Sequence, residues 1–198
     1  MQKILIGFVC MLCVLQATSQ HITIGPTIGL NNSWISESKN IGGKSKIGFN
    51  AGISFIYSIK ENYGLGVDAI YSVEGNKFDP DGTRSLNYLR IPIKAYYFFG
   101  EWGDKFRPKL FLGLSPAFLI GGNIKQGNQE FKSKDFNKGF DLGLNVGTGL
   151  NVRIMEATWL KFDLGYTHGL TKIFKNTSNN SKNQNINFNI GIGFPIGE

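Results

Sequence analysis

Cysteine and histidine are both scarce in this sequence. Its 198 residues include two Cys, at positions 10 and 13, and two His, at positions 21 and 168. Both Cys lie within the first twenty residues, so the rest of the chain can form neither a disulfide nor a cysteine metal site. So few imidazoles also argue against a transition-metal site. We therefore predict no cofactor and no bound metal.

Long apolar runs and concentrated charge are missing as well. Beyond the first twenty residues no segment approaches the ~20 consecutive apolar residues of a membrane helix. The net charge is +7, from 21 basic and 14 acidic residues, but the basic residues are scattered and include no arginine-rich run. Nucleic-acid binding is therefore not expected. The composition, with 41% hydrophobic residues, 26 Gly and 16 Phe, is typical of one folded domain.

The N-terminal segment has the composition of a signal peptide. Lys3 gives it a cationic start, residues 4–15 form a short apolar core, and Ala17, Thr18 and Ser19 supply the small residues that signal peptidase recognises. We predict that residues 1–19 are a cleaved signal peptide and that residues 20–198 form a single exported domain.

The rest of the chain alternates between apolar and polar residues with a period of two. Eight segments share this pattern: 22–30, 49–59, 63–73, 89–99, 110–120, 140–152, 160–170 and 186–196. A period of two is typical of β-strands, and no comparable helical periodicity is present. The sequence therefore predicts an all-β fold.

The segments between these strands alternate in length. Residues 31–45, 75–85, 121–138 and 172–183 are long connections, whereas 60–62 and 155–157 are short and 100–108 is intermediate. Outer-membrane barrels have short periplasmic turns and long outer loops, and an even number of strands returns both termini to the periplasm. The pattern predicts antiparallel neighbours and both termini in the periplasm.

The two faces of the predicted strands indicate which solvent each one meets. In the segment GFNAGISFIYSI the apolar face includes Phe49 and Ile53, while Asn50, Gly52 and Ser54 lie on the other face. Small residues suit the narrow interior of an eight-stranded barrel, where a few bulky side chains fill the space, and apolar residues then face lipid. We predict an eight-stranded antiparallel up-and-down transmembrane β-barrel.

Charged residues share the predicted interior of this barrel. They are Asp68, Asp141 and Asp163 together with Arg90, Lys94, Arg153 and Lys161. They could form an acid/base site or a structural ion-pair network, and we favour the network because buried charges must be paired. No nucleophile accompanies the carboxylates, and His168 is expected to pack at the membrane interface. We predict no catalytic residue.

The long loops are cationic. The basic residues of the two last loops that could contact lipopolysaccharide are Lys125, Lys132, Lys134, Lys172 and Lys175. Cations beside a lipopolysaccharide leaflet would meet its phosphates. Solvated loop tips with no ligand are an equally good interpretation of the same pattern.

Several strands also resemble a known family, the PorT-like outer-membrane β-barrel proteins of Gram-negative bacteria. The resemblance is carried by YLRIP at 88–92 with AYYF at 95–98, by FLGLSPAFLIGG at 111–122, and by FDLGLNVGTGLNV and LKFDLGYTHGLTKI at 140–152 and 160–173. It implies an outer-membrane location and a barrel fold. The named family member resembles an accessory factor of a protein-secretion machinery, and the barrel-strand motifs do not extend that role to this chain.

The predicted function is that of a non-enzymatic platform anchored in the outer membrane, which binds or assembles through its loops. The expected partners are outer-membrane lipid and lipopolysaccharide, the barrel-insertion machinery and an unidentified envelope protein. Two alternatives stay open: an envelope-lipid-modifying enzyme with Asp and His at the rim, and a small-solute channel.

Overall fold

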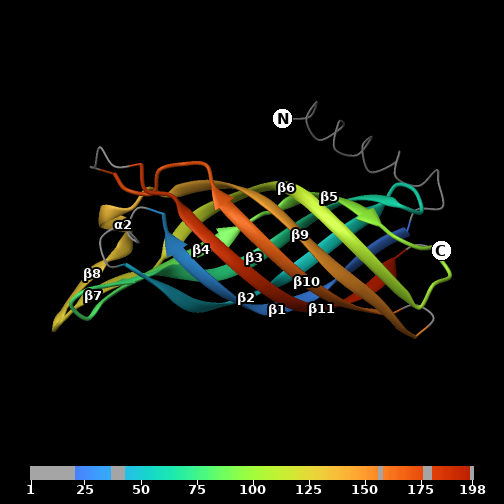
Figure 1. Ribbon diagram of the computed structural model, residues 1–198, viewed down its shortest axis with the longest axis horizontal. Coiled ribbons are helices and arrows are strands. Elements are labelled where there is room, and N and C mark those ends of the chain that lie inside the picture. The colour runs from blue at the N-terminus through green and yellow to red at the C-terminus, as the bar shows by residue number, and fades with distance from the viewer. Residues whose placement is uncertain (1–20, 37–42, 156–157, 176–179, 197–198) are drawn as a thin grey trace, which may run out of the picture.

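The structure is a computed structural model that describes residues 21–36, 43–155, 158–175 and 180–196. The predicted signal peptide, residues 1–19, lies outside the described residues. The strands form a single antiparallel sheet that wraps around into a barrel (Figure 1). The predicted all-β barrel fold is thus confirmed.

Eleven strands and one short helix follow the chain in order. They are β1 (His21–Ile35), β2 (Lys44–Ser58), β3 (Tyr63–Phe78), β4 (Gly82–Arg90), β5 (Ile93–Phe98), β6 (Phe106–Gly121), β7 (Asn123–Gln126), β8 (Gln129–Lys132), α2 (Ser133–Phe136), β9 (Phe140–Met155), β10 (Thr158–Gly169) and β11 (Asn183–Ile196). In the described part of the chain no helix is long and apolar enough to cross a membrane.

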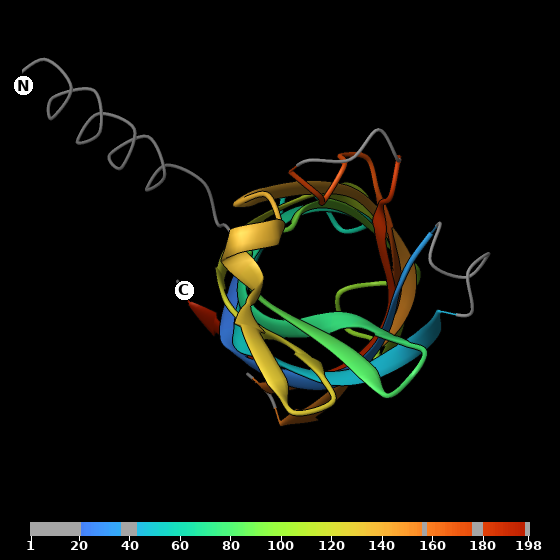
Figure 2. The same cartoon turned by 90° about the vertical axis from the view of Figure 1, so that its left-hand side faces the viewer.

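Strand β1 closes the barrel by pairing with β2 on one side and β11 on the other. Strands β4 and β5 act as one barrel strand that is interrupted at Ile91 and Pro92, because proline has no amide hydrogen to donate. Strands β7 and β8 form a hairpin that extends beyond the wall. Among the described residues, eight barrel strands therefore surround one lumen, seen end-on in Figure 2.

The two ends of the barrel differ. We call the end where β1 begins and β11 ends the terminal end, and the opposite end, with β7, β8 and α2, the loop end. In Figure 1 the loop end lies on the left and the terminal end on the right. At the terminal end, the connections after β2 and β9 are short and the one between β5 and β6 is longer, as the sequence predicted. The hairpin and helix α2 account for much of the predicted loop 121–138.

The two faces of the wall are those predicted from the alternation. Large apolar side chains point outward, such as Ile28 at 66% exposed and Ile53 at 55%, whereas Asn50 and Ser54 on the inner face are buried. An outer surface of this kind suits lipid and not water, because soluble proteins rarely expose apolar patches of such extent. The predicted inward and outward faces of the strands are confirmed.

Several predicted loop boundaries are wrong. Strand β1 continues to Ile35, β3 continues to Phe78, and β4 already begins at Gly82, so most of the predicted loop 75–85 is paired strand. The reason is that these strands extend past the outward apolar band. There both faces carry polar residues, and the hydrophobic alternation that marks a strand disappears although the backbone pairing continues.

Candidate functional site: the charged lumen

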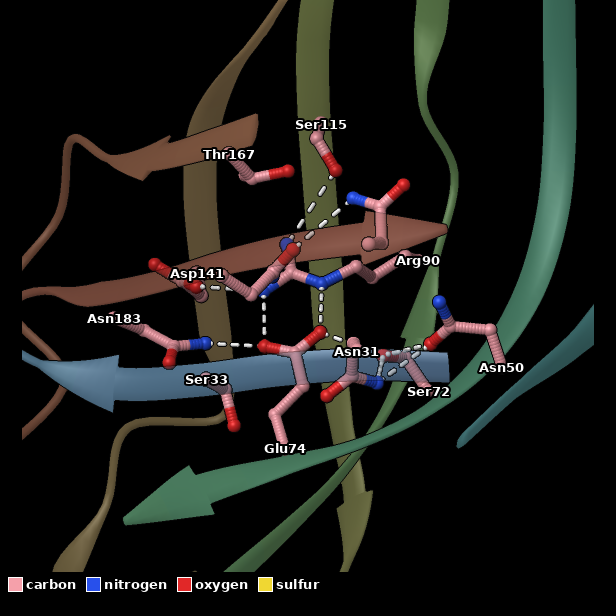
Figure 3. Close-up of polar contacts among 12 residues, drawn as sticks. Asn31, Ser33, Asn50, Ser72, Glu74, Arg90, Ser115, Asp141, Thr167 and Asn183 are labelled. Atoms are coloured by element: carbon pink, nitrogen blue, oxygen red, sulfur yellow. Dashed lines mark hydrogen bonds and ion pairs between the residues drawn. The ribbon is translucent and has the colours of Figure 1, made fainter. Parts of the chain in front are cut away.

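A buried arginine, Arg90, lies among polar side chains from several strands of the barrel (Figure 3). Arg90 of β4 donates from Nε to Oε1 of Glu74 at 2.5 Å and from Nη2 to Oε2 at 2.7 Å. The same Nη2 lies 3.4 Å from Oδ2 of Asp141 on β9. This bidentate pairing holds the guanidinium between two carboxylates, and all three side chains are at most 6% exposed.

Hydrogen-bonding side chains complete the shell around this cluster. Ser72 donates to Glu74 Oε1 at 2.7 Å, Asn183 donates to the other oxygen of Glu74, and Thr171 donates to Asp141 Oδ1 at 2.8 Å. Buried carboxylates are stable only when their oxygens are satisfied in this way. Each carboxylate oxygen of Glu74 and Asp141 therefore has a hydrogen-bond or ion-pair partner.

Two further ion pairs lie closer to the terminal end. Lys94 Nζ is 2.5 Å from Asp68 Oδ2, and Lys109 Nζ is 2.7 Å from Asp163 Oδ1. The Lys94 ammonium also lies 5.4 Å from the centre of the Tyr96 ring. Aromatic rings of one buried cluster fill the space beside these pairs: Tyr96, Phe98 and Phe111, with Ile56. In this layer each lysine is paired with an aspartate, and aromatic side chains fill the space beside the pairs.

The opposite wall of the lumen is lined by amides. Asn31 on β1 donates to Asn50 Oδ1 at 2.8 Å, and Asn50 donates to Asn189 Oδ1 on β11 at 3.2 Å. Asn189 in turn donates to Asn187, which donates to Asn185. These short neutral side chains leave room for the long cations of β4, β5 and β6.

The structure brings together most of the predicted interior charges, but Arg153 lies at the terminal end, where it donates to the carbonyl oxygen of Gly103. Asp68 lies with Lys94 and Asp141 with Arg90, but Asp163 pairs with Lys109, which the sequence analysis did not include. Lys161 forms no ion pair with a described residue and donates to Ser54 Oγ at 2.8 Å.

Glu74 and Lys109 are the two members of the lumen ion pairs that the sequence analysis missed. Glu74 continues the inward row that contains Asp68, six residues earlier, and Lys109 continues the inward row of Phe111. Both stand at the ends of the predicted strands, where the apolar alternation fades. Extending each strand by its period of two would have found them.

The remaining predicted residues lie away from the lumen network. His168 is half-buried, and its Nδ1 lies 3.2 Å from the hydroxyl of Tyr166, which donates to Gln184 at 3.1 Å. The loop-end lysines 125, 132, 134, 172 and 175 are all exposed. Of these, Lys125 lies 3.8 Å from Glu130, and Lys175 donates to the carbonyl oxygen of Lys134 at 2.7 Å.

Little open space interrupts the network. A cavity of about 40 Å³ lies among its polar side chains, and one of about 190 Å³ lies at the terminal end. In the part of the chain that the structure describes, no group of three or more His, Cys, Asp or Glu side chains could hold a metal ion. The lumen thus forms a packed and largely neutralised interior.

Comparisons with known proteins agree with this architecture. Neisserial surface protein A (NspA) is 19% identical, with a TM-score of 0.61, and the match covers 88% of this chain and 97% of that one. OprG of Pseudomonas aeruginosa is 14% identical, with a TM-score of 0.63 over 91% and 97% of the two chains. The N-terminal β-barrel domain of OprF from the same organism is 17% identical, with a TM-score of 0.56 over 90% and 100%.

At these identities the similarity shows the fold alone. No curated protein matches the sequence. Residues 16–175 match the family described as "Outer membrane protein beta-barrel domain". This chain therefore belongs to the family of outer-membrane β-barrel domain proteins, and its location is the outer membrane.

Proposed function

We propose that this protein is a non-conducting, non-enzymatic barrel that serves as a membrane-anchored platform and acts through its loop end. The proposal rests on the filling of the lumen by paired charges. Arg90, Lys94 and Lys109 are each paired with a carboxylate, and their side chains are at most 9% exposed. An eight-stranded lumen is narrow enough for side chains to fill. A filled lumen leaves binding to the exposed ends.

The loop end has the features of a binding surface. The β7–β8 hairpin and α2 carry Phe131 and Phe136, which are 41% and 50% exposed and form an edge-to-face pair at 6.0 Å. Exposed lysines surround them, at positions 125, 132, 134, 172 and 175. Apolar rings flanked by cations suit either the phosphorylated surface of lipopolysaccharide or an acidic envelope protein. We propose lipopolysaccharide as the ligand.

This assignment includes an orientation. The loop end faces outward and both termini face the periplasm, as in other barrels with one set of long connections. A PorT-like role in assisting secretion would act at the same exposed ends. We propose this more specific role from the strand motifs alone.

The surroundings of His168 support a non-enzymatic role. Its ring nitrogen contacts Tyr166, and that hydroxyl contacts an amide, so the described partners include no carboxylate to orient the imidazole as a base. General-base catalysis by His requires a positioned partner on its second nitrogen. The Asp residues of the lumen are engaged with Lys and Arg instead.

Planar-bilayer recording tests the plugged lumen. We expect no steady single-channel current from the refolded protein. Steady currents that change when Asn145 on the inner wall is replaced by Trp would support the channel alternative and contradict the platform proposal.

Site-specific labelling and lipid binding test the loop end. Because the only Cys residues precede position 20, single cysteines can be introduced as Lys132→Cys at the loop end and Lys105→Cys at the terminal end. We expect an impermeant maleimide to label only the first on intact cells. Vesicles containing lipopolysaccharide should bind a Lys132→Gln/Lys134→Gln variant more weakly than the unaltered protein, and equal binding would exclude these lysines as the contact.

A further inference from the structure

The cavity at the terminal end of the lumen has a composition unlike the rest of the interior. Its volume is about 190 Å³, and its walls include the cations Arg107, Arg153 and Lys161 and the indoles of Trp102 and Trp159. Within the described residues, no Asp or Glu is part of its lining. The cavity is therefore cationic and aromatic, and nothing in the platform role requires it.

The register of the sheet places two of these cations on either side of one amide. Asn151 of β9 is the cross-strand neighbour of Arg107 on β6 and of Lys161 on β10. Side chains of directly opposite residues on one face lie within about 5 Å of each other at Cβ. All three line the cavity, so they form one row of donors along its wall.

The two cations in this row form no ion pair with a described residue; the carboxylates nearest in charge, Glu61 and Asp104 for Arg107 and Asp163 and Asp68 for Lys161, act on them from farther away. Arg107 and Lys161 are 4% and 3% exposed. Lys161 has Ser54 as its hydrogen-bond partner and forms no ion pair in the described structure, and Nε of Arg107 lacks a hydrogen-bond partner there. Another nitrogen of Arg107 donates to the carbonyl oxygen of Glu61 at 2.5 Å. A buried cation without a direct ion pair is poorly compensated for its lost hydration, so the cavity favours an anion.

The acidic residues on nearby segments have other partners. Asp163 lies 2.7 Å from Lys109, and the Glu61 carboxylate accepts a hydrogen bond from the backbone amide of Trp102 at 2.7 Å. Asp104 accepts one from the amide of Glu101 at 2.9 Å. The donors of the cavity are thus available to a ligand.

We propose that this cavity binds a phosphoryl group, supplied either as free phosphate or as a small phosphate monoester. A phosphate dianion can offset two cations at once, and its oxygens can accept from a guanidinium, an ammonium and an amide together. The cavity is smaller than the ~300 to 1,000 Å³ of sites for drug-sized ligands, so the ligand is small. The indole walls of Trp102 and Trp159 would contact the organic part of a monoester.

Two glycines of β11 leave space for the side chain of Lys161. Lys161 is paired in register with Gly191, and a Cβ at that position would lie 3.3 Å from Cε of Lys161. Gly193, next on the same face, lies beside the same stem. The missing side chains allow the aliphatic part of Lys161 to lie along β11 while its ammonium stays in the lumen.

Calorimetric titration of the folded protein in detergent tests the site, with inorganic phosphate and phenyl phosphate as ligands at constant ionic strength. Loss of one charge-assisted contact in Arg107→Gln should weaken binding at least about tenfold. Asn151→Asp keeps the side-chain volume and places a carboxylate between the two cations, so we expect it to abolish measurable binding. Lys105→Gln is the matched control, because Lys105 is exposed at the same end and lies outside the cavity.

The outcomes separate the site from general attraction to a basic protein. The site is supported if either ligand binds, if Asn151→Asp abolishes binding, and if Lys105→Gln changes it by less than about twofold, as expected for a screened surface charge. Tighter binding of phenyl phosphate than of phosphate would identify a monoester as the ligand. Absence of binding by both ligands, or equal weakening by Lys105→Gln, would overturn the proposal. Unheated and boiled gel mobility confirms that each variant is folded, and Asn151→Asp should fold because it neutralises buried cations.

Discussion

The lumen has a paired half, which contains Arg90 and Lys94, and a terminal-end half, which contains Arg107 and Lys161, and the two halves compensate positive charge differently. Around Arg90 and Lys94 each cation faces a carboxylate at 2.5 Å, and Ser72, Asn183 and Thr171 donate to the carboxylates beside Arg90. Around Arg107 and Lys161 the lining includes no carboxylate among the described residues. One half of the interior is neutral and packed, and the other is cationic and partly open.

This difference shows that the two halves contribute differently to stability. Where carboxylate and cation are both buried, removing one partner leaves an uncompensated charge, so the paired half should be intolerant of substitution. Where a buried cation has no ion pair, replacing it with an apolar side chain removes the unfavourable free energy of its lost hydration. The same type of residue therefore has opposite energetic roles in the two halves.

The largest effect is expected at the centre of the paired half. Glu74→Ala removes the fully buried carboxylate that holds Arg90, and it should lower the free energy of unfolding by about 3 to 5 kcal/mol. Reversible urea unfolding in a lipid mimic measures this. Glu130→Ala at the exposed pair with Lys125 should change stability by less than about 1 kcal/mol, and a similar loss in both variants would contradict the distinction.

A lysine-to-methionine change compares the halves directly. Lys94→Met leaves Asp68 buried without its cation and should lower stability by about 3 kcal/mol, whereas Lys161→Met removes an unpaired cation and should leave stability unchanged or raise it by about 1 kcal/mol. The test compares the urea midpoints of unfolding of the two variants under the same conditions. Equal destabilisation would mean that Lys161 has a counter-charge in the folded protein.

Packing between the halves should give an intermediate effect. A Cβ at Gly147 would lie 2.3 Å both from a ring carbon of Phe111 and from the carbonyl oxygen of Leu164, so Gly147→Ala should cost about 1 to 3 kcal/mol. Gly103→Ala is the control, because no described atom lies within 4 Å of its Cβ position. If both variants unfold at the same urea concentration, the barrel interior is less tightly packed than the structure indicates.

The smallest effect is expected at the loop end. Lys125→Ala removes an exposed ion pair of 3.8 Å and should lower stability by about 0.2 to 1 kcal/mol in low salt, with the difference vanishing near 1 M salt. Unfolding at both salt concentrations measures it. A salt-independent loss would indicate that the β7–β8 hairpin contributes to the stability of the barrel wall.

Much of the wall could be predicted from the residues alone. The alternation in 49–59 identified both the strand β2 and its two faces, because a narrow closed barrel allows only small or deliberately placed side chains inside. Strand ends were harder to predict. Ser33 and Asn76 lie in strands that have polar residues on both faces, so the signal that marks a strand is absent although the pairing persists.

The interior charges could be named from sequence, but their partners could not. Strand parity placed Asp163 and Lys161 on the inner face, and they are two residues apart on one strand. The structure nevertheless pairs Asp163 with Lys109 of β6. Parity specifies a face and says nothing about the angular position or height of a side chain in the lumen.

The sequence by itself determined the class of fold, the outward apolar face and the polar lumen, because a period of two and a choice of lipid or lumen are local properties of each strand. Only the tertiary structure decided which carboxylate neutralises which cation, and that Arg107, Asn151 and Lys161 stand in one row across β6, β9 and β10. Those relations depend on the stagger with which the strands pair around the barrel. The stagger is a property of the closed sheet and of no single strand.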